Sequence, residues 1–98
     1  MHRTETKVDL AYAQAHASEI TEILRVHHFD NPQFVDYDDP HFGLTLMATP
    51  DESVSLLNVA AAMEDFEGRL GIKVFLLTPS EFERSGQQVP FFPITGTA

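Results

Sequence analysis

The sequence predicts a single α/β (α+β) domain in which helices pack on a small mixed β-sheet. Three observations support this fold class. An amphipathic segment ends at Gly71 and leads at once into the apolar run of residues 72–77, which is typical of a helix followed by a buried strand. Large apolar residues occupy alternate positions over residues 42–48, as in a second strand. The length of 98 residues allows one small core.

The N-terminal part of the chain is expected to be helical. Residues 1–7 are polar and are predicted to fray, whereas apolar residues recur at helical spacing over residues 8–27. Asp9 or Thr6 is expected to cap this helix. Asn31-Pro32 then breaks the pattern, since a proline disfavours helical backbone in the residue before it.

Two strands are expected next. Residues 33–37 form the first candidate, and residues 42–48 form the second. The turn-forming residues 38–40, Asp-Asp-Pro, lie between them. We therefore expect the two strands to pair antiparallel.

The longest predicted helix follows, with Ser53 or Ser55 as its cap and Gly71 as its left-handed end. Its apolar stripe consists of Leu56, Val59, Ala60, Met63, Phe66 and Leu70. If the strands on either side of this helix share a sheet and run parallel, the crossover between them should be right-handed.

The C-terminal part carries weaker signals. Thr78 and Glu81 form a capping box for a short helix over residues 79–85, which Gly86 ends. Residues 87–98 are predicted to be an extended tail that carries two prolines, so that residues 89–94 are suited only to an edge strand or to the tail itself. The whole chain, residues 1–98, is thus one predicted domain.

The core is expected to combine the apolar faces of these elements. The residues predicted to form it are Leu10, Ala17, Ile20, Leu24, Leu44, Leu46, Val59, Met63, Phe66, Leu70, Val74, Leu76 and Leu77.

The charge and composition exclude several classes of protein. The net charge of −9 argues against nucleic-acid binding, which needs clustered lysine and arginine, and favours either simple solubility or a basic protein partner. The absence of cysteine excludes disulfides and thiolate chemistry. No apolar run approaches membrane-spanning length, and the start does not have the pattern of a signal peptide. A cytoplasmic location is therefore expected by default.

A metal site is one hypothesis for the polar residues before residue 42. His28, Asp36, Asp38 and His41 are its candidate ligands. Aspartate is also favoured in turns for backbone reasons alone, and this interpretation has the higher prior. The serines lie in no Gly-x-Ser-x-Gly motif, and the glycines form no phosphate-binding loop, so neither hydrolase nor P-loop chemistry is indicated.

Four pieces of the sequence form a recognisable series: FGLTLM at 42–47, PDE at 50–52, SLL at 55–57 and LGIKVFLLTP at 70–79. This series resembles the middle of a minimal nucleotidyltransferase domain, the small module related to the antitoxin half of HEPN-associated toxin–antitoxin pairs. In that family a strand with Ser-Asp-x-Asp leads through an acidic loop to Ser-Leu-Leu, a helix, Leu-Gly-x-x-Val and Asp-Leu-Val-Thr-Pro. The resemblance implies a nucleotidyltransferase-like fold, and it covers about half of the chain well.

The family's catalytic residues are replaced. By the resemblance, the paired metal-binding aspartates would fall at Gly43 and Thr45, and the third carboxylate at Phe75. The Gly-Ser motif that cradles the phosphates has no counterpart here. Because Mg²⁺ requires oxygen ligands, the resemblance implies a catalytically degenerate member that uses no cofactor. One alternative stays open: Asp36 and Asp38 form an Asp-x-Asp of their own and are the fallback catalytic pair.

Three functional hypotheses follow. The first is a non-catalytic interaction module, antitoxin-like, whose protein partner is of the HEPN-toxin type. The second is an active nucleotidyltransferase with displaced carboxylates, and the third is an unrelated small α/β protein that binds a ligand. A homodimer is also expected, because Phe91, Phe92 and Ile94 in the tail have no obvious place in so small a core and are the predicted interface.

Overall fold

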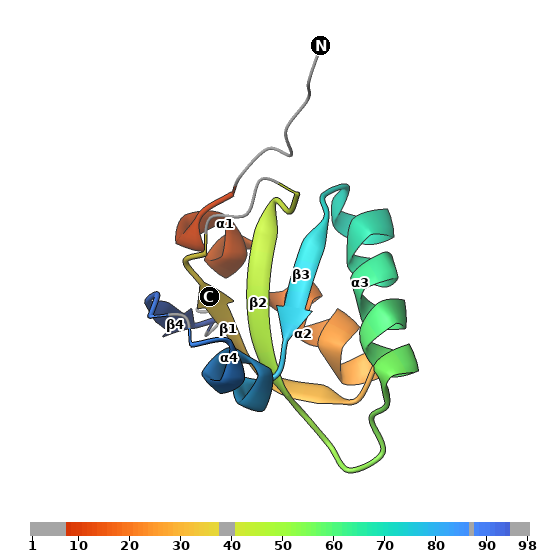
Figure 1. Cartoon of the computed structure of the whole chain (residues 1–98). Helices are drawn as coiled ribbons and strands as arrows, with labels where there is room; N and C mark the ends of the chain where they lie inside the picture. The colour runs from red at the N-terminus through yellow and green to blue at the C-terminus, as the bar shows by residue number, and fades with distance from the viewer. Residues whose placement is uncertain (1–7, 38–40, 87, 95–98) are drawn as a thin grey trace.

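A mixed sheet with strand order β3-β2-β1-β4 forms the middle of the protein (Figure 1). The computed structural model describes residues 8–37, 41–86 and 88–94. In chain order the elements of this part are α1 (Leu10–Ala15), α2 (Ala17–Val26), β1 (Phe29–Val35), β2 (Leu44–Pro50), α3 (Leu56–Leu70), β3 (Val74–Leu77), α4 (Pro79–Ser85) and β4 (Phe91–Pro93). The predicted small mixed α+β fold is confirmed.

The strand pairings follow the predicted pattern. β1 pairs antiparallel with β2, as predicted, and β2 pairs parallel with β3 across α3, which meets the condition stated for the crossover. β4 then returns to pair antiparallel with the outer side of β1. Figure 1 shows α2 behind the sheet, α4 in front of it and α3 beside β3. The sheet therefore has a rear face covered by α2 and α3 and a front face on which α4 packs.

The first helix differs from its prediction. Instead of one helix over residues 8–27, α1 and α2 meet at His16, whose φ of −106° and ψ of 20° depart from helical backbone. The bend keeps Ala13 and Ala17 buried on the same side, so the apolar periodicity runs through it without interruption. No glycine or proline occurs at the bend, so the sequence alone does not predict it. Asp9 caps α1, as expected, by accepting a hydrogen bond from the Tyr12 N–H.

The first strand begins at Phe29 rather than at residue 33, so the prediction that Asn31-Pro32 precedes the strand is wrong. The register with β2 shifts between Asp30 and Gln33, and Asn31 has a left-handed φ of 56°. A bulge of this kind accommodates a proline, because the ladder is already interrupted there. β2 is likewise displaced, and ends at Pro50 instead of residue 48.

The helix ends are the best-predicted local features. Ser55, one of the two expected caps, forms a capping box with Asn58 at the start of α3, and Gly71 ends this helix with a φ of 72°. Thr78 and Glu81 form the second capping box, and Gly86 ends α4 with a φ of 70°. Left-handed backbone favours glycine, so both glycines stand where the chain needs them.

The apolar stripe of α3 is narrower than predicted. Phe66 is completely buried, whereas Leu56 is 81% exposed and Ala60 is also exposed. Ala62, outside the expected stripe, is buried in its place. The first turn of α3 extends past the end of β3 in Figure 1, so the residues of that turn have no strand to pack on.

The core lies mainly between the rear face of the sheet and the helices. Most of the predicted core residues are buried, whereas Leu10, Val59, Met63 and Leu70 are partly buried against it. Leu77 is half-buried and alternates to the front face, away from Val74 and Leu76. The buried members of the cluster are Ala13, Ala17, Ile20, Ile23, Leu24, Phe29, Phe34, Leu44, Leu46, Ala48, Ala62, Phe66, Val74, Leu76 and Ile94.

The burial of α3 gives a direct test of the fold. Phe66→Ala should lower the free energy of unfolding by about 3–5 kcal/mol, because it opens a cavity in the centre of the core. Leu56→Ala on the same helix is the matched control and should change it by less than about 0.5 kcal/mol. Urea denaturation followed by circular dichroism measures both. Equal losses from the two variants would contradict this placement of α3.

Candidate functional site

The three positions assigned to lost catalytic carboxylates lie together at one end of the sheet. Gly43 directly precedes β2, and Thr45 on β2 is in register with Phe75 on β3. The Gly43 N–H donates to the Lys73 carbonyl at 2.8 Å, which fixes the start of the pairing. The Phe75 ring stacks on Phe42 with a centroid separation of 4.9 Å. An apolar ring pair therefore lies beside Thr45.

Thr45 has an unusual environment. It is 1% exposed, and its Oγ1 atom is buried without a hydrogen-bond partner. It faces the front side of the sheet, opposite the core-facing Leu44 and Leu46. A buried hydroxyl that is not hydrogen-bonded typically costs about 1–3 kcal/mol. Within the described residues, no hydrogen bond therefore offsets the cost of burying the Thr45 hydroxyl.

A hollow of about 550 Å³ opens at this end of the sheet, between the start of α1, the end of β1 and the start of β2. Its lining includes Asp36, Gly43, Thr45 and Phe92, which the sequence indicated as site or interface residues and which come from three separate parts of the chain. We call it the Asp36 groove, and the lining residues that matter here are Asp9, Leu10, Asp36, Gly43, Thr45 and Phe92.

The Asp36 groove is acidic. Asp9 and Asp36 line it, and none of its described lining residues is a lysine, arginine or histidine. The Asp9 Oδ1 atom accepts the Tyr12 N–H at 3.0 Å. The Asp36 carboxylate forms no hydrogen bond or ion pair with the described part of the chain, although its own N–H donates to the Pro90 carbonyl at 2.9 Å. A carboxylate without a partner among the described residues therefore lines a hollow whose surface is both polar and apolar.

The proposed metal ligands are not gathered into one site. His28 lies just before β1, whereas Asp36 lies just after it, at the opposite end of the strand. His41 is exposed, and Asp38 falls outside the described residues. Within residues 8–37, 41–86 and 88–94, no three histidine, aspartate or glutamate side chains form a group able to hold a metal ion.

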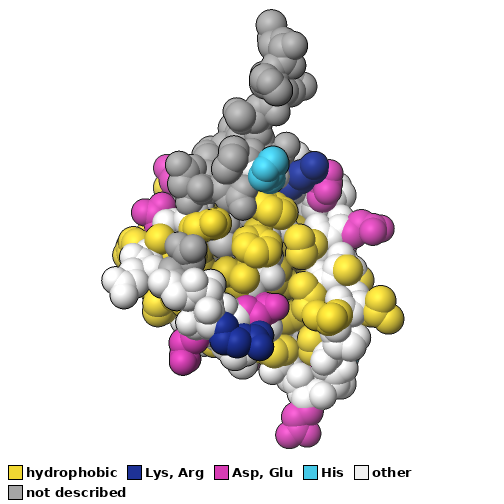
Figure 2. All heavy atoms as spheres, viewed as in Figure 1, with side chains coloured by type: hydrophobic (Ala, Val, Ile, Leu, Met, Phe, Trp, Pro, Cys, Tyr) yellow, Lys and Arg dark blue, Asp and Glu magenta, His cyan; other side chains and the backbone are white. Residues whose placement is uncertain are grey.

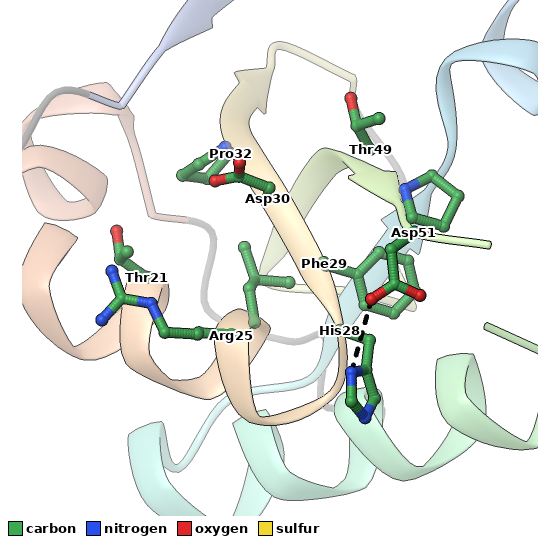
Figure 3. A pocket seen from close by; sticks show the side chains of 10 residues that line it. Thr21, Arg25, His28, Phe29, Asp30, Pro32, Thr49 and Asp51 are labelled. Atoms are coloured by element: carbon green, nitrogen blue, oxygen red, sulfur yellow. Dashed lines mark ion pairs between the residues drawn. The ribbon is translucent and has the colours of Figure 1, made fainter. Parts of the chain in front are cut away.

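His28 instead takes part in a second hollow, of about 650 Å³, at the other end of β1 (Figure 3). Its Nδ1 atom lies 3.4 Å from Asp51 Oδ2, and its carbonyl accepts the Asp51 N–H at 3.0 Å. Figure 3 shows Arg25 on the opposite side of the hollow from the His28–Asp51 pair, with Asp30 above them beside Pro32. The charges of this hollow are mixed, and no sequence motif pointed to it. The contacts between His28 and Asp51 connect the start of β1 to the loop before α3.

The pKa of Asp51 is lowered below its ordinary value, chiefly by hydrogen bonds from Ser53. The Ser53 hydroxyl and N–H donate to Asp51 Oδ1 at 2.6 and 2.8 Å, and the charge of His28 contributes less. A carboxyl group with a lowered folded pKa stabilises the fold above its unfolded pKa, and this contribution is lost as the pH falls through the folded value.

The front face carries exposed apolar side chains. Figure 2 shows them gathered over the middle of this face, with aspartate and glutamate side chains around its margin. Phe91 and Phe92, predicted as interface residues, are 46% and 40% exposed, but they point to opposite faces of the sheet. Phe91 is in register with Val35 and contacts Phe82 of α4 on the front, whereas Phe92 is in register with the core-facing Phe34. Ile94 is 6% exposed and belongs to the core, so its assignment to the interface is corrected. Ile94 directly follows the edge strand β4, whose three residues are exposed, and its own side chain packs into the core.

The two edges of the sheet are formed by β4 and β3. On β4, Pro93 has no N–H, and its carbonyl accepts Gln14 Nε2 at 3.0 Å. On β3, the Lys73 carbonyl points to β2, so the backbone groups of Val74 and Leu76 point to the outer side of the strand. The side chains of these two residues are almost fully buried, and α3 packs on this strand. Pro93 and the packing of α3 therefore work against the addition of a further strand at these positions.

Comparisons of the chain with protein-family models, with curated proteins and with solved structures find no match. The nucleotidyltransferase resemblance therefore rests on the sequence series described above, and the family stays a prediction. In the part of the chain that the structure describes, no helix has the length and apolar character needed to cross a membrane.

The unpartnered hydroxyl gives a second test. Thr45→Val should raise the free energy of unfolding by about 1 kcal/mol, because a methyl group of similar size replaces a buried polar group without a partner. Thr49→Val, at an exposed position of the same strand, should change it by less than about 0.5 kcal/mol. Thermal and urea unfolding measure both variants. A loss of stability in Thr45→Val would show that the hydroxyl is hydrogen-bonded.

The loop before α3 gives a third. Ser53→Ala should raise the pKa of Asp51 toward its ordinary value, because the shortest donor to the carboxylate is removed while the Ser53 N–H remains. His28→Gln should raise it less, since the histidine is the smaller cause. The carboxyl carbon shift of Asp51, followed by NMR over a pH titration, reports both changes. A larger rise in His28→Gln would reverse this order of causes.

Proposed function

We propose that this protein is a non-catalytic member of the minimal nucleotidyltransferase family and acts as a protein-interaction module. The observation that carries the proposal is the grouping of Gly43, Thr45 and Phe75 at one end of the sheet, with no carboxylate on any of them. These are the positions where the resemblance places the metal ligands, so the proposed site lacks the side chains that would hold the metal ions.

The chemistry of nucleotidyl transfer supports a loss of activity rather than a reduction. Two metal ions, about 3.5–4 Å apart, stabilise the attacking and leaving oxygens and are held by carboxylates. Glycine supplies no side chain, and the Thr45 hydroxyl is buried. The ring of Phe75, stacked on Phe42, places an apolar surface where charged phosphates would have to lie, which is costly.

One observation favours the displaced-carboxylate enzyme as a second candidate. Asp36, the fallback catalytic residue, lines the same groove as Gly43 and Thr45. Among the described residues, Asp9 is the only other carboxylate that lines it, and one of its oxygens already caps α1. This set falls short of the oxygen ligands that two Mg²⁺ ions require, so the interaction module remains the preferred function.

The partner that fits the proposal is basic. The net charge of −9 attracts positively charged proteins over a distance set by the ionic strength. A toxin of the HEPN type, encoded by a neighbouring gene, is the partner that the resemblance suggests. The expected homodimer stays a prediction, and the partly exposed Phe91 and Phe92 are its expected contact residues.

The test incubates the protein with labelled ATP, Mg²⁺ or Mn²⁺, and the product of the neighbouring gene. We expect no transfer of label, no heat of ATP–Mg²⁺ binding in calorimetry, and a stable complex between the two proteins. Label transfer that disappears in Asp36→Asn would overturn the proposal in favour of the displaced-carboxylate enzyme. Absence of both transfer and complex would favour the unrelated ligand-binding protein.

A further inference from the structure

We infer that the Asp36 groove binds a lysine or arginine side chain presented by a basic segment of a partner protein. The inference rests on the proposed function in one respect, namely that the protein has a partner. It adds the surface that the partner uses and the chemistry that recognises it.

The shape of the groove suits a long side chain. Its volume of about 550 Å³ lies in the range of specific binding pockets, and Leu10 and Phe92 give it apolar walls. The alkyl stem of lysine or arginine packs well on such walls while its charged end stays near water. Phe92 also offers a partly exposed ring face to a guanidinium or ammonium group.

The charge of the groove selects a cation. Asp36 has a carboxylate without a partner among the described residues, and Asp9 has one oxygen that does not serve the helix cap. No described cation lines the groove to neutralise them. A charge-assisted hydrogen bond to Asp36 is therefore available to an incoming ammonium or guanidinium group.

The surroundings favour a partner protein over a free ion. Two carboxylates are too few for a divalent metal site, and the described residues contain no third ligand nearby. Phe92, which lines the groove, is 40% exposed. A segment that places a basic side chain in the groove also covers this ring, whereas a metal ion or a small amine leaves it in water. Aromatic residues of this kind commonly form the centre of protein interfaces.

The test uses the blocked peptide acetyl-Leu-Arg-Leu-amide as a probe, with acetyl-Leu-Gln-Leu-amide as its neutral counterpart. Titration of the ¹⁵N-labelled protein should shift the amide signals of Asp36, Gly43 and Phe92, with millimolar affinity for the arginine peptide and at least about fivefold weaker binding of the glutamine peptide. Added salt should weaken the first and leave the second unchanged.

Asp36→Asn should weaken binding of the arginine peptide by about fivefold. Asp30→Asn is the matched control, since Asp30 is an exposed carboxylate at the other end of the same strand, and it should leave binding unchanged. Unchanged thermal melts verify that both variants fold. Equal binding of the two peptides, signal shifts centred elsewhere, or equal effects of the two variants would overturn the inference.

The two proposals fail in different ways. If the product of the neighbouring gene binds the protein and Asp36→Asn leaves that affinity unchanged, the groove is not the docking site and the interaction module stands. If label is transferred from ATP, the proposed function fails whatever the peptides do.

Discussion

The burial of β2 on both faces is the constraint on which the rest of the structure depends. Residues 43–48 are all buried, and β2 pairs with β1 on one side and with β3 on the other. A central strand of this kind needs cover on both sides of the sheet. On the rear, α2 and α3 supply it with a continuous apolar core, whereas on the front only the short α4 packs on β2. The front is therefore where the Phe42–Phe75 ring pair and the unpartnered Thr45 hydroxyl are found, whereas the Asp36 groove lies at the end of the sheet beside α1.

Local chemistry made much of this fold predictable. The two glycine helix ends and the Thr78–Glu81 capping box depend on neighbouring residues only, and they were located correctly. The antiparallel pairing of β1 with β2 also followed from the turn-forming residues between them. The bend at His16 was missed because no glycine or proline marks it. Asn31 and Pro32 did signal an interruption, but the interruption lies inside β1 as a bulge and does not precede the strand.

The candidate site was only half visible in the sequence. The series of motifs indicated Gly43, Thr45 and Phe75, and the tail indicated Phe92, but nothing local shows that α1 brings Asp9 to the same hollow. Ile94 was misassigned for a related reason. An apolar residue beyond two prolines is typical of an extended terminal segment, and only the pairing of β4 with β1 places Ile94 in the core. Long-range pairing decides both cases, and a single sequence does not display it.

The two prolines of the β4 segment have a consequence for the protein at high concentration. Cross-β fibrils grow when the unpaired backbone of one chain templates the next, and short segments rich in aromatic and β-branched residues are prone to it. The run from Val89 to Ile94 contains four such residues but is interrupted by two prolines, and its two phenylalanines are partly exposed. Pro93 removes a donor, and its carbonyl already accepts a hydrogen bond from Gln14. Proline at this edge therefore works against pairing with a second chain, while the two rings stay accessible for recognition.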